Sequence, residues 1–149
     1  MSGVTCNEFQ GEELFAKFSL KNKPDKIAYV CIDTGSEPES VISQGMLNYL
    51  GITKTIPQSF TTLETFGNEI IHSTVKVKLS VMFEGCTKLI DLLCVVDHSR
   101  AVSMVLGQAF LRRRELIIDF GVTSQDNYAL RTGPNSELKA WRTNLYFKK

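Results

Sequence analysis

Hydrophobic and polar residues alternate with a period of two along much of the chain, and short clusters of turn-forming residues interrupt the alternation. In the first such stretch, Leu14, Ala16, Phe18 and Leu20 would share one face of a strand, whereas residues 27–32 are apolar on both faces. Successive side chains of a strand point to opposite faces of a sheet, so the alternation is typical of half-buried strands. A run without polar positions is typical of a strand covered on both faces. The pattern therefore predicts an all-β chain with residues 27–32 in its middle.

Three antiparallel strand pairs are predicted from the same alternation and from the turns that separate the strands. Residues 61–65 pair with 70–82, residues 70–82 pair also with 88–96, and residues 115–120 pair with 128–131. The first pair forms a long hairpin around residues 66–69, and a turn at Glu84-Gly85 leads into the second. The strands and the short turns between them are typical of an all-β chain.

Two short helices are predicted between the strands. In residues 40–51 the apolar positions suit a helix, with Ser40 as a candidate N-cap and Gly51 as a stop signal, although Gly45 inside lowers the helix propensity. Residues 107–114 have room for about two helical turns. Their three arginines are expected at a solvated helix end near the negative pole of the helix dipole, and anion binding is the alternative explanation.

The length of 149 residues fits one domain, which we place at residues 14–131. Residues 1–13 form an N-terminal extension, and residues 132–149 form a C-terminal extension that is expected to be helical or to make an interface. A partner subunit would cover the apolar stripe of that helix. The stripe consists of Leu138, Trp141 and Leu145.

Composition and charge narrow the function further. Seventeen Lys and Arg residues against sixteen Asp and Glu residues leave a formal net charge of +1, which argues against nucleic-acid and membrane-surface partners. No apolar run has the roughly 18 residues that a membrane span needs. The N-terminal residues lack the basic start and apolar run of a signal peptide, so we expect a cytoplasmic protein.

The four cysteines show no pair spacing typical of a disulfide framework or a zinc site. Cys6, Cys31, Cys86 and Cys94 are therefore expected to be reduced thiols. Cys94 and His98 have the i, i+4 spacing of a metal or nucleophile pair, but the chain has only two histidines. We predict neither a metal nor a cofactor.

One motif carries candidate chemistry. The apolar run 27–32 leads directly into Asp33-Thr34-Gly35-Ser36, and about seventy residues later Val105-Leu106-Gly107 precedes the second predicted helix. An isolated Asp-Thr-Gly triplet is weak evidence, because it could also be a strand-ending turn in an unrelated β-barrel. Its position after a buried strand makes the motif more informative.

In the order and spacing of these elements, residues 14–131 resemble the retropepsins, the retroviral-type aspartic proteases, and most closely those of long-terminal-repeat retrotransposons or a domesticated derivative. The resemblance rests on Asp33-Thr34-Gly35, Val41-Ile42-Ser43, Leu50-Gly51-Ile52, the long hairpin, Val105-Leu106-Gly107 and Leu116–Phe120. It implies a closed β-barrel of the acid-protease fold with a long flap hairpin, one or two short helices, and half of an active site per chain.

The resemblance implies that Asp33 is the catalytic residue. In this chemistry one carboxylate takes a proton from the attacking water while a neutral carboxyl protonates the peptide carbonyl. Two adjacent carboxyls cannot both ionise and so share one proton, as aspartic-protease dyads do. Because the chain contains a single Asp-Thr-Gly triplet, activity would require a homodimer.

The other site residues are also assigned by resemblance. In the active-site loop, the Thr34 hydroxyl would bond across to the partner subunit's loop, Gly35 would let backbone amides approach the carboxylates, and Ser36 would donate to the outer oxygen of Asp33. The flap would cover a bound peptide. Its tip comprises Thr65, Phe66 and Gly67, the substrate pocket would include Ser103 and Val105, and Gly107 would be the structural glycine behind the site.

The implied function is an aspartic endopeptidase, active as a homodimer without metal or cofactor. Its substrate would be a retroelement Gag-Pol polyprotein or a derived host protein, in the cytoplasm or within virus-like particles. The alternative is a catalytically weak or inactive domesticated domain of the same fold that binds peptides or dimerises. Peptide cleavage that depends on Asp33 would distinguish the two.

Overall fold

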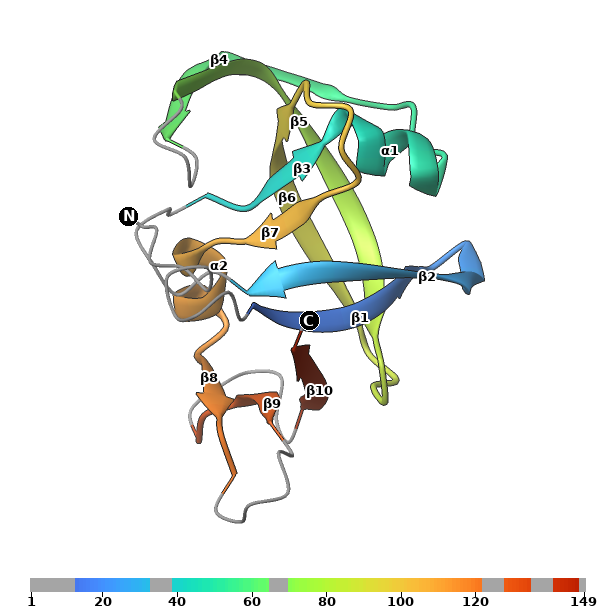
Figure 1. Ribbon diagram of the computed structural model, residues 1–149, viewed down its shortest axis with the longest axis vertical. Coiled ribbons are helices and arrows are strands. Elements are labelled where there is room, and N and C mark those ends of the chain that lie inside the picture. Colours follow the sequence, from blue (N-terminus) through green and yellow to red (C-terminus); the bar gives the residue numbers. More distant parts are fainter. Residues whose placement is uncertain (1–12, 33–38, 65–69, 122–127, 135–140, 148–149) are drawn as a thin grey trace.

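Period-two alternation produces strands in almost every segment where it occurs. The computed structural model describes residues 13–32, 39–64, 70–121, 128–134 and 141–147 (Figure 1). Ten strands and two short helices lie in this part of the chain. In chain order they are β1 (Leu14–Leu20), β2 (Lys23–Ile32), β3 (Val41–Ser43), α1 (Gln44–Leu50), β4 (Ile56–Glu64), β5 (Ile70–Phe83), β6 (Leu89–Asp97), β7 (Met104–Leu106), α2 (Gln108–Arg113), β8 (Leu116–Asp119), β9 (Ala129–Thr132) and β10 (Arg142–Phe147).

The strands close into a barrel. Their order is β4-β5-β6-β3-β7-β2-β1-β10-β9-β8, and β1 also pairs with β5. That extra pairing, with Phe18 opposite Phe83 and Leu20 opposite Val81, joins the two ends of the series β5-β6-β3-β7-β2-β1. The result is a six-stranded closed barrel from which β10, β9 and β8 continue below it in Figure 1. The predicted all-β, closed-barrel fold is confirmed.

The core lies inside the barrel and follows the predicted alternation. Ala16, Phe18 and Leu20 of β1 are buried, and both predicted hairpin pairs after the flap are formed, β5 with β6 and β8 with β9. The middle strand differs from the prediction, because Ile27 and Tyr29 of β2 are each 47% exposed. Only the last two residues of β2 pair with β7. No second layer of this chain, among the described residues, covers the outer face of the first part of β2.

The first predicted helix is shorter than expected. Val41–Ser43 is the strand β3, held between β6 and β7, and α1 begins only at Gln44. The N-cap is Ser43, whose hydroxyl accepts from the Met46 amide at 3.0 Å, so the prediction of Ser40 was wrong. Gly51 ends the helix as predicted, in the left-handed conformation that glycine adopts without strain (φ +71°).

The C-terminal segment also differs from the prediction. Residues 142–147 form β10, which pairs with β1 on one side and β9 on the other, so no helix with Trp141 and Leu145 on one face exists. Trp141 and Leu145 are buried in this chain's own core, where Trp141 packs edge-on against Phe83 at 5.3 Å between ring centroids. Leu138 lies outside the described residues. A spacing of four residues fits one face of a helix and also one face of a strand, and the neighbouring strands decided between them.

The second helix agrees with the prediction. α2 covers Gln108–Arg113, and Arg112 and Arg113 are exposed in its last turn. Across the described ranges, no helix is long and apolar enough to cross a membrane.

Candidate functional site

The candidate motif follows the strand β2 at a defined edge of the barrel. β2 and β7 run parallel, with Cys31 opposite Val105 and Ile32 opposite Leu106. Because the two strands run in the same direction, their last residues, Ile32 and Leu106, lie side by side at one edge of the sheet; Asp33 and Gly107 are the next residues in the sequence. Asp33, Thr34, Gly35 and Ser36 themselves lie outside the described residues, as do Thr65, Phe66 and Gly67 of the predicted flap tip.

Gly107 is held in place by Ser40, just before β3. It is buried, and its amide donates a 3.0 Å hydrogen bond to the hydroxyl of Ser40. The Ser40 carbonyl accepts from the Val95 amide at 2.9 Å, so this residue is fixed through both its side chain and its backbone. Ser40 therefore ties the start of β3 to the glycine that follows β7. Sequence reasoning assigned it a capping role and missed this contact between distant residues.

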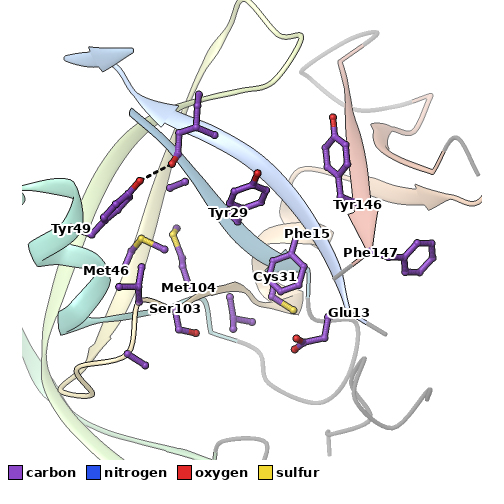
Figure 2. Close-up of a pocket in the computed structure, with 15 residues that line it drawn as sticks. Glu13, Phe15, Tyr29, Cys31, Met46, Tyr49, Ser103, Met104, Tyr146 and Phe147 are labelled. Carbon is purple, nitrogen blue, oxygen red and sulfur yellow. Dashed lines mark hydrogen bonds between the residues drawn. The ribbon is translucent and has the colours of Figure 1, made fainter. Parts of the chain in front are cut away.

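A cavity of about 740 Å³ opens beside β7 (Figure 2). The structure brings the two predicted pocket residues, Ser103 and Val105, to its wall together with Cys31 of β2. Most of the lining is apolar or aromatic, which suits the burial of hydrophobic side chains. The other lining residues are Glu13, Phe15, Ile27, Ala28, Tyr29, Met46, Tyr49, Ala101, Val102, Met104, Tyr146 and Phe147.

One wall of the cavity is the segment 99–103, called here the pocket loop, and Ser43 fixes it to helix α1. The Ser43 hydroxyl accepts from the amides of Met46 and Ser103, both at 3.0 Å, and donates to the carbonyl of Ala101. The Ser43 amide donates to the Ser103 carbonyl at 3.0 Å. This set of bonds gives the pocket wall a defined position relative to the barrel.

Gly45 allows the pocket loop to approach the helix. Its amide donates to the Ser99 carbonyl at 3.0 Å. A Cβ at this position would lie 2.6 Å from the carbonyl carbon of Arg100 and closer still to the carbonyl oxygens of Arg100 and Ala101. The sequence shows Gly45 only as a weak helix residue; the close approach of the loop explains why a glycine is required there.

The ionisable groups around the cavity are few. Among the described residues, those that line it are Glu13, Cys31, Tyr29, Tyr49 and Tyr146. The hydrogen bond to the Glu84 carboxylate raises the pKa of Tyr146 above its ordinary value. Cys86 and Cys94 are reduced thiols, as is Cys31, and Cys6 lies outside the described residues. Burial raises the pKa of Cys94 to about 12, while His98 is exposed, so this pair lacks the reactive thiolate that nucleophilic or metal chemistry needs. Within the described residues, no group of three or more His, Cys, Asp or Glu side chains could hold a metal ion.

Comparison with known proteins supports the fold. No protein-family model matches the chain, and no curated protein matches it. Among solved structures, it is similar to the crystal structure of the retroviral protease-like domain of Ddi1 from Leishmania major, with a TM-score of 0.53 and 16% sequence identity. The similarity covers 92% of this chain and 91% of that chain. At this level of identity it establishes the architecture alone, and the chain has the retropepsin-like fold.

Proposed function

We propose that this protein is an aspartic endopeptidase that acts as a homodimer, with one Asp33 from each chain. The observation that carries the proposal is the position of the Asp-Thr-Gly triplet. It follows β2, whose last three residues are buried and whose end lies beside the end of β7, in a barrel of retropepsin-like fold. The substrate is a retroelement Gag-Pol polyprotein or a derived host protein. The enzyme cleaves it in the cytoplasm or within virus-like particles.

The requirement for two chains follows from the chemistry and from the surroundings of Asp91 and Asp119. Asp91 pairs with Lys78 and accepts from the Ser80 hydroxyl at the exposed surface. Asp119 is bound by Arg131, and the hydrogen bond from the Gly121 amide is the main cause that lowers its pKa. Neither carboxyl is available as the protonated partner of Asp33. A second copy of the chain supplies it about a two-fold axis.

In the proposed mechanism the two Asp33 carboxyls share one proton. The ionised carboxylate takes a proton from a water molecule while the water oxygen attacks the peptide carbonyl carbon. The neutral carboxyl donates its proton to the carbonyl oxygen. The tetrahedral intermediate then breaks its C–N bond as the amine takes up a proton. The wall that contains Cys31 and Val105 favours apolar side chains next to the scissile bond.

The experiment is a cleavage assay over a protein concentration series. We expect turnover of an apolar peptide below neutral pH, activity that rises faster than linearly near the dimer dissociation constant, and its loss in Asp33→Asn. Asp25→Asn, which changes an exposed aspartate of β2, is the matched control and should retain activity. Circular dichroism and gel filtration of each variant exclude loss of fold.

Two outcomes would contradict the proposal. Cleavage that persists in Asp33→Asn would mean that another group is catalytic. Equal peptide binding by wild type and Asp33→Asn, with no cleavage by either, would favour the peptide-binding module.

A further inference from the structure

Exposed hydrophobic side chains concentrate around the cavity. Ten large hydrophobic side chains are exposed among the described residues, and five of them line it. These five, called here the outer groove, are Ile27, Tyr29, Tyr49, Val102 and Phe147. A contiguous apolar patch on a soluble domain marks an interaction site more often than single exposed hydrophobic residues do.

The outer groove is continuous with the candidate active site. Residues 27, 29 and 31 occupy alternate positions of β2 and therefore share one face. Ile27 and Tyr29 lie in the outer groove, while Cys31 lines the cavity beside Val105, two residues before Asp33. At about 3.3 Å per residue, Ile27 lies roughly 17 Å along the strand from Ile32, the last residue of β2, which Asp33 follows in the sequence. That distance corresponds to about five residues of an extended peptide.

The walls of the outer groove are held in position. The Tyr49 hydroxyl of α1 donates to the Ile27 carbonyl at 3.1 Å, a bond drawn in Figure 2, which fixes the ring across the groove from β2. Val102 belongs to the pocket loop that Ser43 anchors. A peptide would therefore meet a preformed surface, and less ordering would oppose binding.

Charge indicates the chemistry of the occupant. Lys26 places its amine 4.4 Å from the Tyr49 ring centroid, and the Lys17 amine lies 5.7 Å from the ring of Tyr29 and 4.4 Å from that of Tyr146. Glu13 is the carboxylate among the described lining residues, and Figure 2 shows it beside Cys31 and Phe15, away from Tyr49. Two ammonium groups thus lie against tyrosine rings of the cavity wall: that of Lys26 near Tyr49, and that of Lys17 near Tyr29 and Tyr146, where the Glu84 carboxylate accepts from the Tyr146 hydroxyl.

We propose that the outer groove binds a second, remote anchor of the polypeptide substrate: an apolar residue four to six positions from the scissile bond, next to an acidic residue. The inference rests on the proposed protease function. It adds that the enzyme selects an extended substrate segment, because aromatic contacts anchor the apolar side chain and the lysines attract the neighbouring carboxylate.

The test compares short and long peptides that share one cleavage site. The long peptides carry an apolar-acidic pair four to six residues away, on the amino side in one series and on the carboxyl side in the other. We expect one series to show a kcat/KM about tenfold higher than the short peptide, through a lower KM. Tyr29→Ser should lower the ratio of kcat/KM for the long peptide to kcat/KM for the short peptide to about one. Leu93→Ser, at a residue of β6 that is 50% exposed and outside the groove, is the matched control.

Charge supplies a second measurement. Replacing the acidic residue of the long peptide by lysine should lower its gain about threefold at low salt, with a smaller effect at high salt because exposed charges are screened. A wild-type enzyme that cleaves long and short peptides equally would overturn the proposal. So would a Tyr29→Ser variant that dissociates the dimer without changing the ratio of long to short, because the groove would then be a contact between copies.

Failure of the proposed catalysis can be separated from failure of the groove. Anisotropy of a fluorescent long peptide on the Asp33→Asn protein measures binding without cleavage. If adding Tyr29→Ser to the Asp33→Asn protein weakens peptide binding about tenfold, the proposed role of the outer groove is supported even when no peptide is cleaved. Binding that is unaffected by Tyr29→Ser contradicts it.

Discussion

Replacing Gly45 by alanine tests whether the pocket loop depends on a missing side chain. The added Cβ would lie 2.6 Å from the Arg100 carbonyl carbon, and nearer to two carbonyl oxygens of the loop. All three neighbours are backbone atoms, so relief requires the whole loop to move away from α1. Such a shift breaks the Gly45–Ser99 hydrogen bond and the two bonds by which the Ser43 hydroxyl holds Ala101 and Ser103.

The expected loss follows from these contacts. Three hydrogen bonds at about 1 kcal/mol each give a loss of about 3 kcal/mol. Alanine is favoured over glycine inside a helix by about 1 kcal/mol, which offsets part of that loss. The net decrease in unfolding free energy is therefore about 2 kcal/mol, which lowers the melting temperature by roughly 4–8 °C for a domain of this size.

Thermal and urea unfolding measure the effect directly. Gly133→Ala is the matched control, since its Cβ would meet one atom, the Glu115 carbonyl oxygen, at 3.3 Å, and it should change the melting temperature much less. If Gly45→Ala were as stable as the wild type or more stable, helix propensity would dominate at this position and the account of the loop contact would be refuted.

Two further predictions concern buried polar groups. Ser43→Ala removes the acceptor of two amides and should lower the unfolding free energy by about 2–3 kcal/mol in urea titrations, whereas Ser80→Ala, which loses one exposed bond to Asp91, should have an effect below about 1 kcal/mol. Burial raises the pKa of Cys94 to about 12, whereas an unfolded thiol ionises near pH 8.5. Between these two pH values the unfolded state loses the thiol proton while the folded state keeps it. The contribution of Cys94 to the unfolding free energy is therefore fully present below about pH 8.5 and decreases by up to about 1.4 kcal/mol per pH unit as the pH rises toward 12. The urea midpoint should therefore decrease more between pH 8 and pH 10 in the wild type than in Cys94→Ala. An equal decrease in both proteins would show that the buried thiol does not contribute to this pH dependence.

The local sequence pattern was sufficient to predict the structure wherever the conformation of a segment depends on its own residues alone. The alternation in β1 identified its buried face, and Gly51 ended α1 because few residues other than glycine adopt a left-handed conformation without strain. The Asp-Thr-Gly triplet and the strand before it were also visible in the sequence, because covalent order alone places Asp33 at the end of β2.

Residues with a distant partner could not be assigned in this way. Ser40 and Ser43 both look like helix caps, but Ser40 bonds Gly107, 67 residues away, and only Ser43 caps α1. Gly45 lowers the helix propensity of its segment, and the reason for a glycine there is the close approach of the pocket loop, which begins more than fifty residues later. Their roles depend on contacts that no window of neighbouring residues contains.

The sequence by itself therefore determined most of the strands, although not β3 or β10, and the place of the candidate aspartate in the chain. The tertiary structure decided what buries the apolar side chains: Trp141 and Leu145 entered the barrel's own core on a strand, while Ile27 and Tyr29 remained exposed around a groove. Hydrophobicity is not directional, so a sequence specifies that an apolar side chain needs cover, and only the pairing of distant strands specifies which surface provides it.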